Sequence, residues 1–570
     1  MAPQELREAI ERHVLPGMHL HFPSTPSRAN AAIRALACSY RGRDPRFLLS
    51  TSGFHSTAHL LALLRLGRTY LACFFGDNYP TPRPNGLYTS VAREGAELQQ
   101  WTLLSYTAAL QAGARGHRYA LAPSLQDSDV GRDLRRAGQY LEVPDPARPE
   151  TAIGLVRALR PDISFVHAPL GTKDGALIAF PPYGEGYWSA VSATTGVIAT
   201  VEEIVDASSR DWAGSTVLPA GHALAVCALP GGAQPQQLYT PAAARAAHYR
   251  DDPYSYGLWR RLATDRPLFE DFTTQVLEAP DPEAAYWDYI RRARTSPATD
   301  PGTQPALATS PVRPDPQEAT VLRAAAAIVR AVSRGGHRRI LAGIGQSFLA
   351  ARLAHHTLAR TGLQLPVMVE TGLYDVDCGP LADSFLLGHR NVAQAGRLTS
   401  IEDVLGSWAC GAQSGGCLAV VGAAQADPHG HVNSTRLRDG TQLVGSGGAS
   451  DLAAHADEVI VLTTCRPDRL VPAVDHITST GRAVRTIATD LCTLHRDDPA
   501  STIWTATDLA PDLVPDHAGD LAPDQAPDHA SAQALRRFLC WPDIHITTST
   551  FRPTPEEVTL LRQLTHERAD

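Results

Sequence analysis

The stretch RILAGIGQSFLAARLAHHTLARTGLQLPVMVETG (residues 339–372) changes its hydrophobic period twice. The apolar run at 339–342 predicts a strand, and a Gly-Ile-Gly turn separates it from a helix predicted at 347–360. A second apolar strand at 367–370 ends at a Thr-Gly turn. A strand, tight turn, helix and strand in this order are typical of a parallel sheet with a right-handed crossover.

The N-terminal half begins with the same order of elements. Residues 18–22 and 47–51 predict strands, and a Pro-Ser-Thr-Pro-Ser turn leads into a helix predicted at 27–40. We therefore predict an α/β protein with two similar open parallel-sheet domains in tandem. Where the first half has Thr51 at the end of its second strand, the second half has Glu370.

The position of Glu370 makes it a candidate for chemistry. In open parallel sheets ligands bind outside the carboxyl ends of the strands, and a buried strand carries this carboxylate to that edge. The structural alternative is a glutamate that caps a helix or pairs with an arginine, and position alone does not separate the two.

Low-complexity stretches suggest the domain boundaries. Pro, Gly, Thr and Ala dominate residues 296–318, which predicts a linker between domains at 1–295 and 319–570. A second such stretch at about 506–533 repeats Ala-Pro-Asp and predicts a mobile surface insertion in the second domain. Its histidines could be metal ligands, but its composition favours a polar loop.

The composition excludes several classes of protein. The chain has 570 residues, 44% hydrophobic and 19% charged, with a net charge of −8, which gives no support for nucleic-acid or membrane-surface binding. The first residues lack the pattern of a secretory signal, and no stretch reaches the roughly 18 apolar residues of a membrane span. Nine scattered cysteines are typical of a reducing compartment. We expect a cytoplasmic protein.

Eight segments of the chain occur in an order found together in one family. They are residues 159–168, 197–205 and 230–235 in the first half, and residues 343–346, 369–372, 424–435, 445–451 and 475–481 in the second half. In this order they resemble the family I CoA-transferases, especially the glutaconate type, with the A-like subunit (the first three segments) and the B-like subunit (the other five) joined head to tail. The resemblance implies a NagB/RpiA/CoA-transferase-like fold for both halves.

The resemblance also implies a reaction. Glu370-Thr371-Gly372 matches the family's Glu-x-Gly turn, whose glutamate is the nucleophile. The implied activity is transfer of coenzyme A from an acyl-CoA to a second carboxylic acid through a glutamyl-CoA thioester. The acyl-CoA is a cosubstrate, and no tightly bound cofactor or metal is implied. The family assembles with twofold symmetry, so we expect a homodimer or higher homo-oligomer.

Glycines form two further candidate sites. Gly445, Gly447 and Gly448 resemble the family's oxyanion loop, in which backbone N–H groups reach the reacting oxygen with no side chain in the way. The alternatives are a phosphate or dinucleotide loop or a flexible turn, and Ser450 stands where a dinucleotide loop needs its third glycine. Gly343, Gly345 and Gln346 open a helix, which predicts either a CoA-binding site or a tight turn.

Amide side chains complete the predicted site. Gln425 and Asn433 lie in the segment that resembles the family's substrate-side loop, where amides orient carboxylate or thioester oxygens. Gln99 and Gln100 stand where many A-type subunits have an acidic pair, which argues against relatives that place a working glutamate in that half. The His-x-His pairs at 19–21 and 429–431 have no third ligand in register, so we expect no metal site.

Two alternatives to CoA transfer stay open. One is acyl-CoA hydrolysis, ring opening or decarboxylation on the same fold, because the sequence does not reveal whether water or an acid meets the intermediate. The other is a non-catalytic acyl-CoA-binding protein, which Gln99 and Gln100 would support and Glu370 argues against. The acyl group and the acceptor acid are not identified by the sequence.

Overall fold

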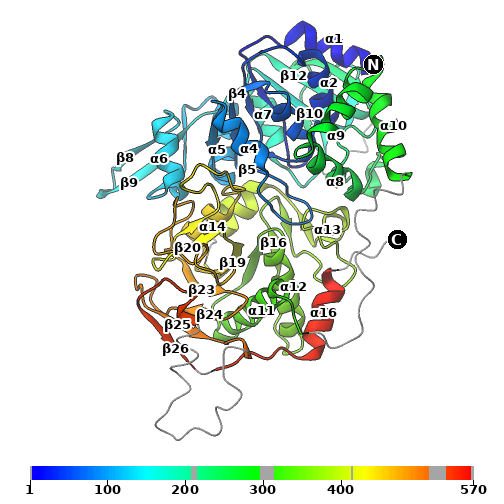
Figure 1. Ribbon diagram of the computed structural model, residues 1–570. Helices are drawn as coiled ribbons and strands as arrows, with labels where there is room; N and C mark the ends of the chain where they lie inside the picture. The colour runs from blue at the N-terminus through cyan, green and yellow to red at the C-terminus, as the bar shows by residue number, and fades with distance from the viewer. Residues whose placement is uncertain are drawn as a thin grey trace, which may run out of the picture.

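The computed structural model describes residues 3–206, 215–295, 313–411, 415–511, 535–547 and 549–565. Figure 1 shows the N-terminal half above the C-terminal half, each built on one large sheet. All strands of the first large sheet lie before residue 229, and all strands of the second follow residue 338. The chain therefore has the tandem α/β architecture that the sequence predicts.

The first sheet is parallel through its centre, with an antiparallel extension at one side. Strand β1 pairs in parallel with β2 and β10, and β2 and β4 continue the parallel order to β6. Its strands are β1 (His19–His21), β2 (Phe47–Ser50), β4 (Gly67–Ala72), β6 (Glu97–Gln100), β10 (Ile163–Thr172), β11 (Leu177–Ala179), β12 (Gly196–Val205), β13 (Thr216–Leu218) and β14 (Ala223–Ala228).

The second sheet repeats the parallel centre and has antiparallel strands toward both ends. Strand β15 pairs in parallel with β16 and β19, and β22 and β23 follow. Its strands are β15 (Arg339–Ala342), β16 (Val367–Val369), β17 (Leu373–Tyr374), β18 (Arg397–Leu398), β19 (Cys417–Gly422), β22 (Glu458–Leu462), β23 (Val484–Ala488), β24 (Thr493–His495), β25 (Trp504–Thr507) and β26 (Ile544–Ile546).

Helices cover the sheets, and the first crossover of each half is the one predicted. Apolar residues at helical spacing put one face of α2 against the first sheet and one face of α12 against the second. The helices are α1 (Pro3–His13), α2 (Asn30–Tyr40), α3 (His59–Leu63), α4 (Gly86–Arg93), α5 (Leu103–Ala114), α6 (Asp129–Arg136), α7 (Glu185–Ser192), α8 (Pro253–Leu262), α9 (Arg266–Phe272), α10 (Pro282–Thr295), α11 (Pro316–Arg334), α12 (Gln346–Ala359), α13 (His389–Gln394), α14 (Ala449–His455) and α16 (Pro555–Thr565).

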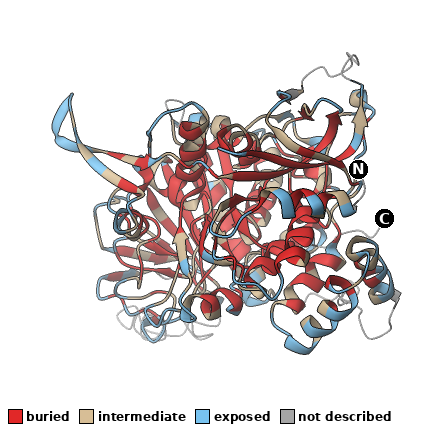
Figure 2. Cartoon of the chain, turned by 90° about the horizontal axis from the view of Figure 1, so that it is seen from above, coloured by how far each residue is buried: buried red, intermediate tan, exposed pale blue. Residues whose placement is uncertain are grey.

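The two halves share part of their hydrophobic core. One buried cluster joins Leu71 and Trp101 of the first half to Leu341 and Met368 of the second. An arm formed by α6 and the three strands β7 (Tyr119–Leu121), β9 (Arg148–Arg157) and β8 (Tyr140–Asp145) extends beside the second half, and the tip of its β8–β9 hairpin is exposed (Figures 1 and 2). The halves therefore fold against each other over a continuous apolar contact.

Only a few residues of the predicted linker and of the predicted insertion lie in the described part of the chain. Helix α11 begins at Pro316, so the last three residues of the predicted linker are helical, and residues 296–312 lie outside the described part of the chain. The first residues of the predicted insertion belong to β25 and a buried Leu509, whereas residues 512–534 lie outside the described part. The domain division itself stays a prediction.

Candidate active site

Glu370 directly follows the buried strand β16 and is half-buried at the carboxyl edge of the second sheet. The turn after it needs a glycine: Gly372 has a φ of +102°, and a β-carbon there would lie 2.8 Å from the carbonyl oxygen of Thr399. The N–H of Gly372 donates to the carbonyl of Val369 at 3.1 Å, which closes the turn. The Glu-x-Gly spacing thus presents the carboxylate at the end of a rigid strand.

The environment makes this carboxylate hard to ionise. Burial and, after it, the negative charge of Asp451 together raise the pKa of Glu370 to about 7, although the N–H of Gly448 opposes both by donating to the carboxylate. A carboxyl group with a pKa near 7 is present in both its protonated and its ionised form at neutral pH. Such a raised pKa is typical of carboxyl groups at functional sites.

The predicted oxyanion loop of the second half, residues 445–448 and called the glycine loop below, is held by hydrogen bonds to the first half. The N–H of Gly447 donates to the carbonyl of Cys73 at 3.0 Å, and the N–H of Leu103 donates to the carbonyl of Gly447 at 2.9 Å. The hydroxyl of Ser446 donates to the carbonyl of Trp101 at 2.6 Å. These bonds join residues more than 300 positions apart, so the loop takes its shape from both halves.

The same loop lies against Glu370. A β-carbon on Gly448 would overlap the Oε2 atom of Glu370, and one on Gly447 would lie 3.8 Å from its Oε1 atom. Gly445, at a φ of +103°, packs against the Gln100 amide, because a β-carbon there would lie 2.5 Å from Gln100 Nε2. The structure therefore brings together the predicted nucleophile and the predicted oxyanion loop.

Asp451 and Gln100 are two further residues at this site. Asp451 is fully buried, and its carboxylate accepts from the N–H of Leu104 at 3.0 Å and from the Ser124 hydroxyl at 2.5 Å. The Gln100 amide ends β6 and donates to the carbonyl of Cys73 at 2.6 Å, the same oxygen that accepts from the glycine loop. The sequence offered one signal for Asp451, its place three residues after the glycine run, and none for its contact with α5.

The Gly343–Gln346 turn lies at a contact between the halves. The N–H of Gly343 donates to the carbonyl of Val420 at 2.9 Å, and Gln346 opens α12. Gly345 has a φ of +82°, and a β-carbon there would lie 3.1 Å from the Thr81 side chain. The positive φ and the close Thr81 side chain explain why residue 345 is a glycine. The CoA-binding role of this turn stays a prediction.

The predicted substrate amides are engaged in bonds within their own hairpin, β20 (Gln425–Ala426) and β21 (Val432–Asn433). Asn433 Nδ2 donates to Gln425 Oε1 at 2.8 Å, and Asn433 Oδ1 accepts from the N–H of Thr435 at 3.0 Å. Gln425 Nε2 donates to Asp475 at 3.2 Å. Both side chains are buried, so the bonds favour a structural role, and substrate contact stays a prediction.

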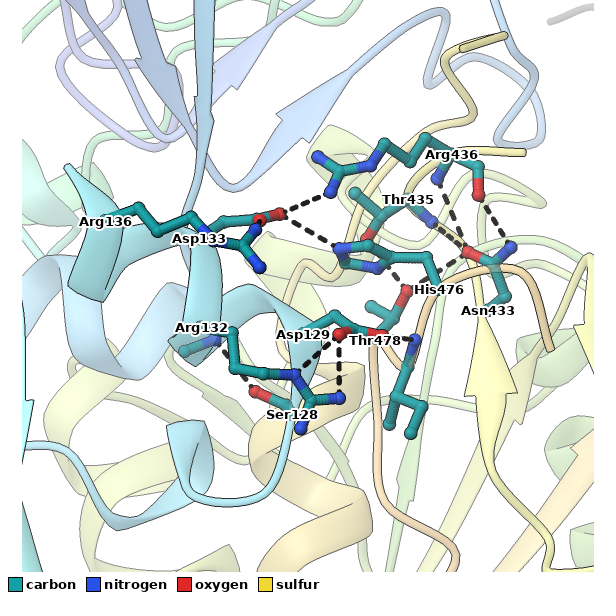
Figure 3. A network of polar contacts seen from close by, with 12 residues as sticks. Ser128, Asp129, Arg132, Asp133, Arg136, Asn433, Thr435, Arg436, His476 and Thr478 are labelled. Carbon is teal, nitrogen blue, oxygen red and sulfur yellow. Dashed lines mark hydrogen bonds and ion pairs between the residues drawn. The ribbon is translucent and has the colours of Figure 1, made fainter. Parts of the chain in front are cut away.

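Helix α6 of the first half holds the segment beside this hairpin. Figure 3 shows Asp133 between two side chains of the second half, His476 at 3.1 Å and Arg436 at 2.8 Å. Asp129 accepts from the N–H of Ile477 at 2.7 Å, and the hydroxyl of Thr478, the next residue, accepts from the N–H of Ser434 at 2.9 Å. The arm thus fixes the loop that precedes the glycine run.

The histidine pairs behave as hydrogen-bonding groups in this structure. His19 Nε2 and His21 Nδ1 both contact the Ser50 hydroxyl, at 2.7 and 3.1 Å, so the two rings share one face of β1. His429 and His431 stack with their ring centroids 5.5 Å apart. Within the described ranges no three His, Cys, Asp or Glu side chains form a group suited to a metal ion, and no described helix is long and apolar enough to cross a membrane.

Comparison with known proteins gave partial sequence matches. No family model matches the chain. The A subunit of the 3-oxoadipate CoA-transferase of Pseudomonas knackmussii is 28% identical over 158 residues, which is 28% of this chain and 51% of the relative. The B subunit of the glutaconate CoA-transferase of Acidaminococcus fermentans is 37% identical over 68 residues, 11% of this chain and 25% of the relative. The chain thus matches about half the length of the first relative and a quarter of the second.

Solved structures match over nearly the whole chain. An acyl-CoA transferase (YdiF) of Escherichia coli O157:H7 has a TM-score of 0.61 at 13% identity, covering 97% of this chain and 95% of that one. A Pseudomonas malonate decarboxylase has a TM-score of 0.52 at 14% identity, covering 99% and 91%. At this identity the structures establish the fold alone. Together with the sequence matches, they confirm the predicted fold and the resemblance to CoA-transferases with A-like and B-like parts.

Proposed function

We propose that this chain, which joins relatives of the A and B subunits of CoA-transferases in one polypeptide, transfers coenzyme A from an acyl-CoA to a carboxylic acid through Glu370. The observation that supports this most is the contact of the Glu370 carboxylate with the Gly447–Gly448 backbone, at a pKa of about 7. Neither relative is matched over its whole length, so the reaction is inferred from the site.

The reaction begins with the ionised form of Glu370. One carboxylate oxygen attacks the thioester carbonyl, the C–S bond breaks, and the products are a mixed anhydride and a CoA thiolate. The thiolate then attacks the glutamyl carbonyl, which releases the first acid as a carboxylate and leaves CoA as a thioester of Glu370. The carboxylate of a second acid reverses the two steps and leaves as its CoA thioester.

The glycine loop supplies the hydrogen-bond donor for these steps. The N–H of Gly448 already donates to the Glu370 carboxylate, and it keeps the same direction toward the glutamyl carbonyl oxygen of the intermediate. A backbone donor aimed at a developing oxyanion is typically worth about 10² to 10³ in rate. Because the loop is anchored on Cys73 and Leu103 of the other half, this donor does not have to reorganise during the reaction.

Trapping the intermediate tests the proposal. The protein is incubated with a panel of acyl-CoAs, then treated with borohydride or hydroxylamine, and the modified peptide is identified by mass spectrometry. We expect a CoA-dependent modification of Glu370 and its absence in Glu370→Gln. Unchanged turnover in Glu370→Gln would rule out the proposed nucleophile.

Product analysis separates transfer from hydrolysis. With an acceptor acid present, a transferase forms the new acyl-CoA in an amount equal to the acid released from the donor. A hydrolase releases free CoA at the same rate with or without the acceptor. A protein that binds acyl-CoA but does neither would be the non-catalytic alternative.

A further inference from the structure

The π-helix η5 (Glu402–Ala409) lies beside the glycine loop, and the thiol of the next residue, Cys410, donates to the carbonyl of Asp451 at 3.3 Å. The N–H of Cys410 donates to the carbonyl of Leu405 at 2.9 Å, five residues back, which is the hydrogen-bond pattern of a π-helix. Such helices are rare and are frequently found at functional sites. The side chains of η5 are therefore candidates for a role in the reaction.

Leu405 of this helix lies against the Glu370 carboxylate. A β-carbon built on Gly448 would overlap Oε2 of Glu370 and would also lie 3.4 Å from Cδ2 of Leu405, so the methyl group and the carboxylate lie against the same point of the glycine loop. Leu405 is 0% exposed. Because a methyl group forms no hydrogen bond, the space that it fills beside the carboxylate is closed to water.

Exclusion of water dominates the environment of Glu370. Burial is the largest cause of its raised pKa, followed by the negative charge of Asp451. The thiols of Cys73 and Cys410 lie near enough to feel the charge of Glu370, and burial raises the pKa of both, so they are uncharged at neutral pH. The apolar side chain of Leu405 is thus part of the surroundings that keep this carboxylate dry.

Both halves of the chain hold η5 in place. Glu402, at its start, accepts from the Gln111 amide of α5 at 2.5 Å and from the Trp188 indole N–H of α7. A β-carbon on Gly406 would lie 3.3 Å from Leu104 of α5, so the middle of the helix also packs on the first half. Leu405 is therefore fixed beside the carboxylate by the same contact between halves that fixes the glycine loop.

In the proposed reaction, water competes with the acceptor acid for the glutamyl thioester. If water attacks the glutamyl carbonyl, the C–S bond breaks, CoA leaves as its thiol, and Glu370 returns as a carboxylate after releasing one proton to the solvent. The energy of the thioester is then lost, whereas attack by a carboxylate conserves it in a new acyl-CoA. A site that holds water back from this carbonyl prevents hydrolysis of the reactive intermediate.

We propose that Leu405 keeps water away from the glutamyl carbonyl of the intermediate and thereby decides between transfer to an acid and hydrolysis. This inference rests on the proposed function. The side chain takes no part in the bonds that form and break, and acts through the space that it fills next to Glu370 and Gly448. The discrimination against water is thus a property of one apolar residue of η5.

The test is the replacement of Leu405 by alanine. Leu405→Ala leaves a space bordered by the Glu370 carboxylate and the N–H of Gly448, and such polar groups can hold a water molecule that a purely apolar cavity would leave out. Each acyl-CoA of the trapping panel is offered with an excess of an acceptor acid of different chain length, and free CoA and new acyl-CoA are measured. We expect the ratio of free CoA to new acyl-CoA to rise at least about 10-fold, which corresponds to about 1.4 kcal/mol between the two competing barriers.

Two matched variants control for packing. Leu405→Met keeps an apolar side chain of similar volume and is expected to keep the ratio of wild type. Leu358→Ala, near the end of α12, removes the same atoms from a leucine that is 1% exposed and belongs to a different core cluster, so it is expected to lower stability without changing the ratio. When Leu405→Ala is combined with Glu370→Gln, the release of free CoA should disappear, because the water attacks the thioester of Glu370.

Several results would overturn the inference. An unchanged ratio in Leu405→Ala, or an equal rise in Leu358→Ala, would contradict it, and so would a loss of transfer and hydrolysis in equal proportion. A wild type that releases free CoA as fast as it forms new acyl-CoA would also contradict it. If Leu405→Ala does not fold, Leu405→Val provides a smaller truncation for the same comparison of ratios.

Thermal unfolding separates this inference from the proposed function, because it needs no turnover. Glu370 has a raised pKa, so its ionised form destabilises the folded state above pH 7, and Glu370→Gln raises Tm there. If Leu405→Ala admits water, the pKa of Glu370 falls toward 4.5, and Glu370→Gln should raise Tm less in the Leu405→Ala background than in wild type. If wild type transfers CoA from no thioester of the panel, the proposed function fails and this comparison alone decides, since an equal gain in both backgrounds contradicts the exclusion of water by Leu405.

Discussion

Replacing Glu370 by glutamine is expected to stabilise the protein at neutral and alkaline pH. The pKa of Glu370 is raised from 4.5 to about 7, so the folded state binds a proton that the unfolded state has already lost between these values. Stability therefore falls as the pH rises from 4.5 to 7, by about 3 kcal/mol in total. The glutamine side chain of the variant would carry no charge, so the variant avoids this loss while its amide oxygen still accepts from the N–H of Gly448.

The assay is thermal unfolding as a function of pH. For 570 residues the entropy of unfolding is about 1.2 kcal/mol/K, so 3 kcal/mol corresponds to a rise in Tm of about 3 °C. We expect the variant and the wild type to differ little below pH 4.5, to diverge between pH 4.5 and 7, and to differ by a constant amount above pH 7. A difference in Tm that does not change with pH would refute the reasoning.

Glu458 provides a control of opposite sign. It is 6% exposed, and although burial alone would raise its pKa, the His337 and Arg334 side chains that bond to it lower the pKa below 4.5. Its stabilising contribution is present above pH 4.5 and disappears as the pH falls through the lowered pKa. Glu458→Gln is therefore expected to lower Tm at pH 8, where Glu370→Gln raises it.

Three further outcomes follow from the site. Asp451→Asn removes the negative charge that raises the pKa of Glu370, so the acid limb of the pH profile of kcat/KM is expected to move to lower pH, and an unmoved limb would contradict the coupling. Gly448→Ala would put a methyl group into the Glu370 carboxylate, and kcat should fall at least about 10²-fold, whereas Gly257→Ala, in a helix with open space, should retain activity. Asp133→Asn removes the carboxylate that contacts Arg436 and His476 of the other half, and we expect the free energy of unfolding, measured with denaturant, to fall by about 1 to 2 kcal/mol. An unchanged free energy would show that this contact contributes nothing to the association of the halves.

Local hydrophobic patterns predict the first crossover of each half well. The strand predicted at 339–342 is β15 residue for residue, and the helix predicted at 347–360 is α12 shifted by one residue. The carboxyl-edge position of Glu370 follows from the same pattern, because a buried parallel strand leaves its next residue at the sheet edge. These features depend on residues that are close in the sequence.

Contacts between distant segments could not be predicted in this way. The bond from Asp451 to Leu104 and the contact of Gly445 with Gln100 join the two halves, and no local period encodes them. Asn433 shows the opposite case: its amide suggested a ligand-binding residue, but it bonds to Gln425 and Arg436 of its own loop and to the Thr478 hydroxyl.

The anchoring of the glycine loop on Cys73 and Leu103 has a consequence for how such a site is made in a cell. In the proposed reaction the second half supplies Glu370 and the glycine loop and the first half holds that loop in place, so two separately synthesised pieces would have to meet in equal numbers. A continuous polypeptide guarantees that one-to-one ratio and holds the pieces at the high effective concentration of tethered partners, typically millimolar for a short tether. Every finished chain then carries both parts of the proposed site.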